Sequence, residues 1–252
     1  LSIALSLETG SLAFGGSSGS GGVTALINGL RVTFDLAIGL PGNFSLSTTG
    51  KFSVDVASLE IDVPGAVNIK AAGIRIQYDP SVAASVDQEL VRIDTASLSF
   101  LSGKVVGSIS PARDSSGALT PGLIVRSRSF TLGQAEILVA PAGGISIGSV
   151  LRLKDVRIGV TNYTVVFGGA DPAFSGSIYI ASGGATLTVA GGAFTATLSD
   201  RIGGDDVNPD GSLNTEALCA ELQFANGRVK GFLFRVDTLT LNVAGTLNIN
   251  AR

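Results

Sequence analysis

Apolar and polar residues alternate along most of the chain. Residues 30–38 show the pattern, with an apolar residue at every second position from Leu30 to Ile38. The same alternation recurs in residues 44–56, 59–69, 74–78, 91–100, 105–109, 123–131, 151–160, 163–167, 176–180, 185–198, 232–236 and 239–249. A period of two residues is typical of half-buried β-strands. The pattern predicts roughly thirteen to sixteen strands, with turn signals about every 8–12 residues.

A short phrase within this pattern recurs. It stands at Phe52–Ile61, returns at Val91–Phe100, and returns two residues shorter at Phe234–Leu241. The first and third copies run on into a second shared phrase, at 59–71 and 239–251, with Gly, Asn, Ile and Ala at matching offsets. Matches of this length within one chain indicate internal repetition.

Each copy changes face in its middle. In the first copy the apolar residues Val54 and Val56 lie at even positions and share one face. The next large apolar residue, Leu59, lies at an odd position. A change of parity without a Gly-Pro break predicts a bulge or bend in the strand. An aspartate precedes each change, at Asp55, Asp94 and Asp237. We expect these carboxylates to accept hydrogen bonds from backbone freed by the bend, and a row of cation ligands is the alternative.

The fold class predicted from these features is all-β. The copies are irregularly spaced, which a strict solenoid does not allow. We therefore expect an elongated stacked or curved β-sheet with irregular internal repeats, and a β-sandwich is the alternative. Residues 1–252 are interpreted as a single repetitive module of a longer chain, with a possible sub-boundary near residues 111–122. One short helix is predicted near residues 214–222, where Leu218, Cys219 and Leu222 form an apolar stripe.

Composition narrows the possible functions. The chain has 34 Gly, 15% charged residues and a net charge of −3, which suits many short strands joined by tight turns and gives no basic block for nucleic acid. It has no His, which removes the usual general base and the commonest metal ligand. No apolar run approaches the ~18 residues of a transmembrane helix, so no transmembrane segment is expected.

The chain also lacks the groups of the common catalytic sites. Without His no Ser can be activated in a triad, and Cys219 stands alone. The glycine-rich stretches lack the Lys-Ser/Thr pair of a phosphate-binding loop. We therefore expect a protein that is not an enzyme.

One loop contains many oxygen ligands. Residues 206–216 read Asp-Val-Asn-Pro-Asp-Gly-Ser-Leu-Asn-Thr-Glu. This loop resembles the calcium loops of dockerin and EF-hand modules, with Gly211 at the sharp turn. The resemblance implies a Ca²⁺ site. Its candidate ligands are Asp206, Asn208, Asp210, Ser212, Asn214 and Glu216. The loop departs from the family at its twelfth position, where Ala217 replaces the acidic ligand; a polar turn before a helix is the alternative.

The overall texture, with repeated strand phrases and low charge, resembles large repetitive bacterial secreted or cell-surface proteins of the adhesin and calcium-dependent repeat type. This resemblance implies an extracellular, non-enzymatic structural or adhesive module. It also implies self-association, with other copies of the chain as partners and fibre formation as one outcome.

Two other functions stay open. Long sheets with one apolar face also resemble the AsmA/TamB-like bridge proteins, which carry lipid along a hydrophobic groove. A groove left open by the apolar faces would favour that interpretation. A carbohydrate-binding β-sandwich is the third alternative, although the chain has no Trp and only 3 Tyr to form sugar platforms.

Overall fold

The computed structural model describes residues 2–14, 22–35, 50–100, 102–114, 116–139, 145–147, 151–153, 156–167, 173–182, 185–189, 194–199, 220–234, 238–243 and 247–251. Most of these residues are β-strand and none is helix, which confirms the predicted all-β class. The predicted helix is wrong at residues 220–222, which belong to a strand, while residues 214–219 lie outside the described part of the chain.

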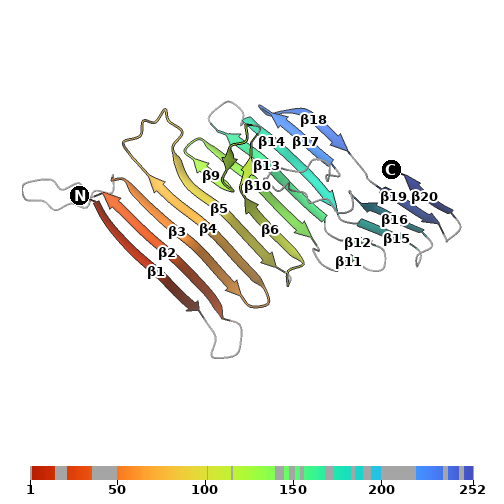
Figure 1. The fold of residues 1–252 in the computed structure, drawn as a ribbon, viewed down its shortest axis with the longest axis horizontal. Coiled ribbons are helices and arrows are strands. Elements are labelled where there is room, and N and C mark those ends of the chain that lie inside the picture. The colour runs from red at the N-terminus through yellow and green to blue at the C-terminus, as the bar shows by residue number, and fades with distance from the viewer. Residues whose placement is uncertain are drawn as a thin grey trace, which may run out of the picture.

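A broad antiparallel sheet dominates the molecule (Figure 1). Its strands are β1 (Ser2–Phe14), β2 (Val23–Asp35), β3 (Phe52–Val63), β4 (Val67–Tyr78), β5 (Glu89–Phe100), β6 (Val105–Ser110), β9 (Leu123–Arg126), β10 (Ser129–Val139), β13 (Val156–Val166), β14 (Ala173–Ser182), β17 (Ala220–Ala225) and β18 (Arg228–Phe234). Their order is β1-β2-β3-β4-β5-β6-β10-β13-β14-β17-β18, with β9 between β5 and β10 beyond the end of β6. The sheet is thus a simple meander, in which each long strand pairs with the next.

A second antiparallel sheet extends the same run of strands. It contains β11 (Ile145–Ile147), β12 (Leu151–Leu153), β15 (Ala185–Val189), β16 (Phe194–Ser199), β19 (Thr238–Val243) and β20 (Leu247–Ala251), in that order. Two residues separate β12 from β13 and two separate β14 from β15. The neighbouring strands β12, β15, β16 and β19 of the second sheet therefore stand in the same order as the neighbouring strands β13, β14, β17 and β18 of the large sheet.

A small third sheet interrupts the strand formed by β6 and β9. It consists of β7 (Ala112–Arg113) and β8 (Leu119–Thr120), and it occupies the predicted sub-boundary at residues 111–122. The turn between its strands is held by the carboxylate of Asp114, which accepts hydrogen bonds from the backbone N–H groups of Ser116 (2.8 Å) and Ala118 (3.0 Å).

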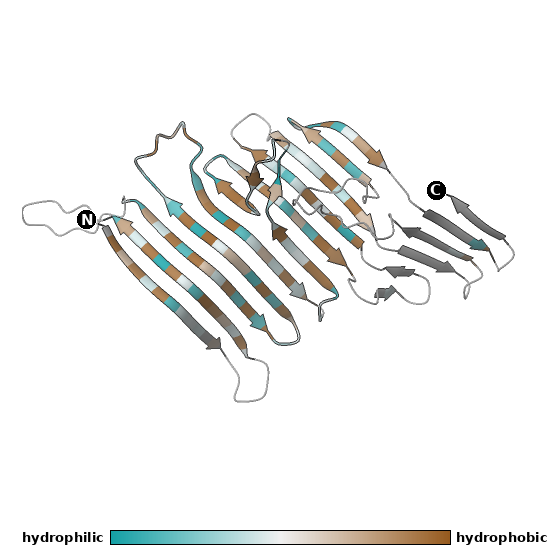
Figure 2. Cartoon of the chain, in the orientation of Figure 1, coloured by the Kyte–Doolittle hydropathy of each residue, from teal (hydrophilic) through white to brown (hydrophobic). Residues whose placement is uncertain are grey.

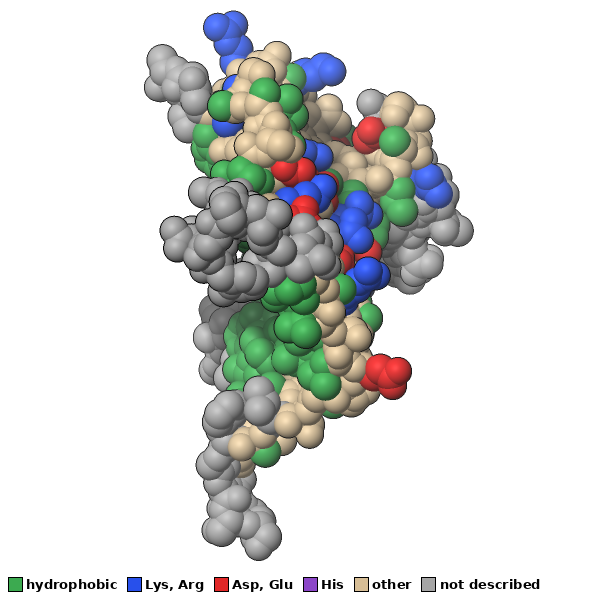
Figure 3. Space-filling model, turned by 90° about the vertical axis from the view of Figure 1, so that its left-hand side faces the viewer, with side chains coloured by type: hydrophobic (Ala, Val, Ile, Leu, Met, Phe, Trp, Pro, Cys, Tyr) green, Lys and Arg blue, Asp and Glu red, His purple; other side chains and the backbone are tan. Residues whose placement is uncertain are grey.

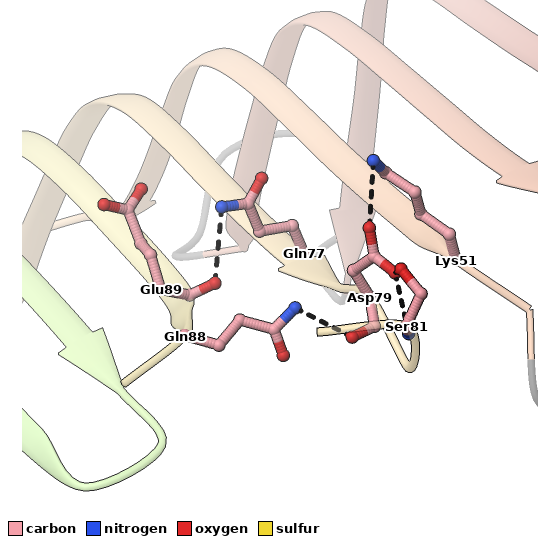
Figure 4. A network of polar contacts seen from close by, with 6 residues as sticks. All are labelled: Lys51, Gln77, Asp79, Ser81, Gln88 and Glu89. Atoms are coloured by element: carbon pink, nitrogen blue, oxygen red, sulfur yellow. Dashed lines mark hydrogen bonds and ion pairs between the residues drawn. The ribbon is translucent and has the colours of Figure 1, made fainter. Parts of the chain in front are cut away.

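The loop from β4 to β5 is also held by side chains (Figure 4). Asp79 accepts a hydrogen bond from the backbone N–H of Ser81 at 3.0 Å and forms an ion pair with Lys51 Nζ at 3.1 Å. Gln88 Nε2 donates to the Asp79 carbonyl at 3.1 Å, and Gln77 Nε2 donates to the Glu89 carbonyl at 3.3 Å. These bonds join the start of β3 to the β4–β5 connection.

A line of positions at which the regular pairing of neighbouring strands is skipped or shifted crosses the large sheet, and we call it the seam. Its members are Glu8, Gly29, Ala57, Gly73, Asp94, Gly122, Gly133, Asn162 and Gly176. Regular pairing continues on both sides of it: Asn28 lies opposite Ser58 and Leu30 opposite Val56, with the pair between them skipped. Left-handed backbone occurs at Gly29 (φ 62°) and Gly73 (φ 63°), a conformation that favours glycine.

The seam is where the strands change parity. A Cβ built on Gly10 would lie 2.8 Å from Leu7 Cδ2, so these positions, three residues apart on either side of the seam, face the same way. In an unbroken strand they would face opposite sides of the sheet. The predicted bend in the repeated phrase is therefore confirmed in β3 and β5. Its third copy spans residues 235–237, which lie outside the described residues.

Candidate functional site

One face of the large sheet is apolar on both sides of the seam. On one side of the seam, the side that contains residues 9–14 of β1, directly paired residues of the other strands form a row: Ile27, Leu59, Ala71, Ala96, Ile109, Ala135, Val160, Ile178, Leu222 and Phe232. The next row contains Ala25, Ile61, Ile69, Leu98, Gly107, Ile137, Ile158, Ile180 and Ala220. Directly paired residues point to the same face, so the rows form a continuous aliphatic surface.

The pattern continues on the other side of the seam, the side that contains residues 2–7 of β1. Directly paired residues there form the row Leu5, Val32, Val54, Ile76, Val91, Val125, Phe130, Val165 and Phe174. Figure 2 shows the resulting alternation of hydrophobic and hydrophilic residues along the strands. In Figure 3, which looks from the β1 side, hydrophobic side chains gather in one patch below a cluster of charged ones.

No second layer of described residues buries this face. Ile137 is 53% exposed, Ile158 is 49% exposed and Phe232 is 66% exposed. The fully buried apolar residues among those described are few, and the cluster of Tyr179 and Ala181 sits in rows that alternate with the apolar ones. Contiguous exposed apolar surface of this kind marks an interaction site or a ligand-binding groove.

A groove of about 490 Å³ runs across the apolar face from β4 to β14. Small residues at Ala96, Gly107 and Ala135 lower its floor, and larger aliphatic residues flank them. The aliphatic lining is Ile69, Leu98, Ile109, Ile137, Ile158, Val160 and Ile178. Ser97, Ser108 and Glu136 also border the groove, but they alternate with the aliphatic positions, and their side chains belong to the other face.

The chemistry of this groove is that of an aliphatic binding surface. Its volume falls within the ~300–1,000 Å³ range of small-molecule sites. Among the described residues of the aliphatic rows, no charged or polar side chain projects into the groove to serve in acid–base or nucleophilic chemistry. It also lacks the aromatic platforms on which a sugar would stack. It matches a flexible hydrocarbon chain best.

The opposite face is polar and carries its own buried cluster. The Tyr179 ring is fully buried, and its hydroxyl donates to Glu136 Oε2 at 2.8 Å while accepting a hydrogen bond from Gln134 Nε2 at 3.1 Å. Gly159 lies beneath the ring, where a Cβ would come within 2.5 Å of Tyr179 Cζ. The cluster fixes β10, β13 and β14 to one another under the groove.

The seam carries a charged row on the polar face. Arg31 lies opposite Asp55, which lies opposite Arg75, which lies opposite Arg92. Asp55 accepts from Arg75 Nε at 2.6 Å, and this hydrogen bond raises the pKa of Arg75 above its ordinary value. The prediction that the repeated aspartates bond the backbone is wrong for the Asp55 and Asp94 side chains, because Asp94 likewise accepts from Arg92 Nε, at 2.9 Å.

The predicted metal sites can be placed only in part. Among the described residues no three acidic, Cys or His side chains are grouped to hold a metal ion, so Asp55 and Asp94 form no cation row there. Asp237 lies outside the described residues. The whole calcium loop lies outside them too, with Asp206, Asn208, Asp210, Ser212, Asn214 and Glu216, and the Ca²⁺ site stays a prediction.

Sequence reasoning assigned no residue of the groove to a binding site. Alternation shows that Leu98 and Ile137 lie on apolar faces, but not that they share a row. That requires the register, which brings Leu98 opposite Gly107 and Gly107 opposite Ile137. A glycine inside an alternating strand was the available signal, since it marks a place where something approaches the sheet closely.

Two comparisons with known proteins give no guide to function: no protein-family model and no curated protein matches the chain. Within the described residues, no helix is long and apolar enough to span a membrane.

Proposed function

We propose that this protein binds the acyl chains of lipids on the apolar face of its large sheet. The observation that carries the proposal is the aliphatic groove across β4 to β14, lined by residues such as Leu98, Ile137 and Ile158 that stay half-exposed. An open groove is the feature that favours a lipid-carrying function of the kind implied by the resemblance to AsmA/TamB-like proteins.

The energetics support an acyl chain as the occupant. Each methylene transferred from water to an apolar surface contributes about 0.8 kcal/mol. An unbranched chain has no hydrogen-bonding groups to satisfy, which suits a groove whose side chains offer none. A sugar would leave its hydroxyls unpaired against Ile109 and Ile178, and each buried unpaired hydroxyl costs about 1–3 kcal/mol. The carbohydrate-binding alternative is therefore disfavoured.

The protein needs no catalytic group for this function, and its place outside the cell stays a prediction. The apolar rows extend beyond the groove to both sides of the seam, from β1 to β18. Hydrocarbon chains could therefore lie along the face as well as in the groove. In this proposal the Arg31–Asp55–Arg75–Arg92 row on the polar face remains in water.

Native purification tests the proposal. We expect organic extracts of the purified protein to contain lipid acyl chains by mass spectrometry. The variant Ile137→Lys places a charge in the groove and should lose most of this lipid, because burying an unpaired charge is costly. The matched control Ser108→Lys places the same charge on the opposite face and should keep it. Wild-type protein free of lipid after detergent-free purification, and unable to take up added fatty acid, would refute the proposal.

A further inference from the structure

A polar hollow crosses the face of the large sheet opposite the groove. It has a volume of about 540 Å³ and runs from β2 to β5 along the seam. Small residues of the seam line it, and Gly29 and Gly73 among them have left-handed backbone. Because these glycines have no side chain, the space above them is bordered by the charged side chains of neighbouring positions. Those side chains are Arg31, Asp55, Arg75, Arg92 and Asp94.

The charges around this hollow do not alternate throughout. Arg31, Asp55 and Arg75 lie opposite one another on β2, β3 and β4, with alternating sign. Arg92 of β5 breaks this alternation, because it lies opposite Arg75. Directly opposite side chains have Cβ atoms about 4.5–5.5 Å apart, and like charges there are destabilising. Three arginines and two aspartates line the hollow, so its lining carries one excess positive charge, although the whole chain has a net charge of −3.

Each of the two opposing arginines is bonded to an aspartate through one nitrogen. Asp55 Oδ1 accepts from Arg75 Nε at 2.6 Å, and Asp94 Oδ1 accepts from Arg92 Nε at 2.9 Å. A guanidinium has five N–H donors in a planar fork. The other donors of both side chains have no acceptor among the described residues. The two guanidiniums are therefore held in place while most of their donors stay available to a ligand.

Arg31 supplies the third positive charge of the hollow. It lies opposite Asp55 in the register, yet it is exposed and forms no ion pair or hydrogen bond with any described residue. Lys51 and Lys70, in contrast, each form an ion pair with a nearby acidic residue at 3.1 Å. Arg31 is thus the cation that remains when the two aspartates are bonded to the other two arginines.

We propose that this hollow binds a phosphate or sulfate group between the guanidiniums of Arg75 and Arg92, with Arg31 as the neighbouring charge. Planar guanidinium forks match these oxyanions with paired, charge-assisted hydrogen bonds. An anion between two opposing arginines also offsets the repulsion between them. Asp55 and Asp94 hold the two side chains before the anion arrives, which is the support that a preorganised site requires. The inference rests on the polar face alone and holds whether or not the apolar face binds lipid.

Calorimetric titration of inorganic phosphate at constant ionic strength tests this site. Arg92→Gln removes one guanidinium, and Arg75→Lys keeps the positive charge but loses the planar fork. We expect both variants to bind phosphate at least about tenfold more weakly than wild type, because hydrogen bonds between charged groups are the stronger ones. The matched control Lys70→Gln removes a positive charge from the same face outside the hollow and should bind phosphate like wild type. Circular dichroism of each variant checks that it is folded.

Lipid vesicles distinguish a phosphate headgroup from a soluble phosphate. If the hollow takes a headgroup, wild type should sediment with vesicles of phosphatidylcholine and phosphatidic acid in preference to phosphatidylcholine alone, and Arg92→Gln should lose this preference. Phosphate binding in the calorimeter without that preference assigns the site to a soluble phosphate. Two results would overturn the proposal. One is a folded wild type that shows neither saturable phosphate binding nor the vesicle preference, and the other is equal phosphate affinity in wild type, Arg92→Gln and Arg75→Lys.

Discussion

Replacing Gly159 by alanine should strongly destabilise the sheet beneath the groove. The new methyl would lie 2.5 Å from Tyr179 Cζ and its hydroxyl oxygen, and 2.8 Å from the Ala135 carbonyl oxygen. Carbon atoms in contact prefer separations of about 3.5–4.0 Å, so the ring must move. It is fully buried and held by Glu136 and Gln134, and it cannot shift without breaking those bonds.

The magnitude follows from these two effects. Inserting a methyl into a packed site costs about 1–3 kcal/mol. Each of the hydrogen bonds that join the Tyr179 hydroxyl to Glu136 and Gln134 contributes about 1 kcal/mol. Replacing Gly by Ala also reduces the conformational entropy of the unfolded chain, which stabilises the folded state by about 0.4–1 kcal/mol and offsets part of this loss. We expect the free energy of unfolding of Gly159→Ala to fall by about 2–4 kcal/mol.

Urea unfolding followed by circular dichroism measures this difference, and Gly107→Ala is the matched control. A Cβ on Gly107 would meet Leu98 Cβ at 3.8 Å and the Glu136 carbonyl at 4.0 Å, which is ordinary contact. Gly107→Ala should therefore be neutral or more stable by up to about 1 kcal/mol. If Gly159→Ala unfolds within about 0.5 kcal/mol of wild type, the packing assigned to Tyr179 is wrong.

Three further predictions concern the seam and the polar contacts. Gly73→Ala should destabilise by about 1–2 kcal/mol, measured by thermal melting, because Gly73 has φ 63° and a Cβ would collide with the Asp94 carboxylate. Tyr179→Phe should lower the unfolding free energy by about 1–3 kcal/mol in urea, since it leaves Glu136 and Gln134 without their shared partner. At Asp87, desolvation raises the pKa, but hydrogen bonds from Ser129, the Arg128 N–H and Ser127 outweigh it and lower the pKa. A carboxyl group with a lowered folded-state pKa stabilises the fold above its ordinary pKa of about 3.9, and this stabilisation is lost as the pH falls through the folded-state pKa. The difference in melting temperature between wild type and Asp87→Asn should therefore shrink as the pH falls from 6 to about 3. A constant difference would contradict this.

The fold class and the bends in the strands could be predicted because both depend on patterns among residues that are close in sequence. Period-two alternation marks each strand, and the parity change between Val56 and Leu59 marks the point where β3 crosses the seam. Seam glycines such as Gly29 and Gly73 could be recognised as breaks in the strand pattern, but only the structure shows that they align across neighbouring strands. Alignment depends on register, which a single strand does not encode.

The groove and the Tyr179 cluster depend on longer-range relations. Tyr179 Oη reaches Glu136 across 43 positions of sequence, and no local pattern pairs them. The predicted backbone role of Asp55 failed for a similar reason, because Arg75, twenty residues away, lies directly opposite it. Local chemistry suggested a hydrogen bond to the backbone, whereas the antiparallel pairing of β3 with β4 placed a cation opposite the carboxylate.

The central claim is that the apolar face binds acyl chains, and titration of a fluorescent fatty acid into Gly107→Leu tests it most directly. Leucine at this position fills the floor of the groove, and its Cβ would make only ordinary contacts, at 3.8 Å or more. Loss of about two buried methylenes weakens binding about tenfold. The account predicts that loss for Gly107→Leu and unchanged affinity for Ser108→Leu, whose new side chain faces the polar side. Equal affinity in both variants and wild type, with both variants folded, would contradict it.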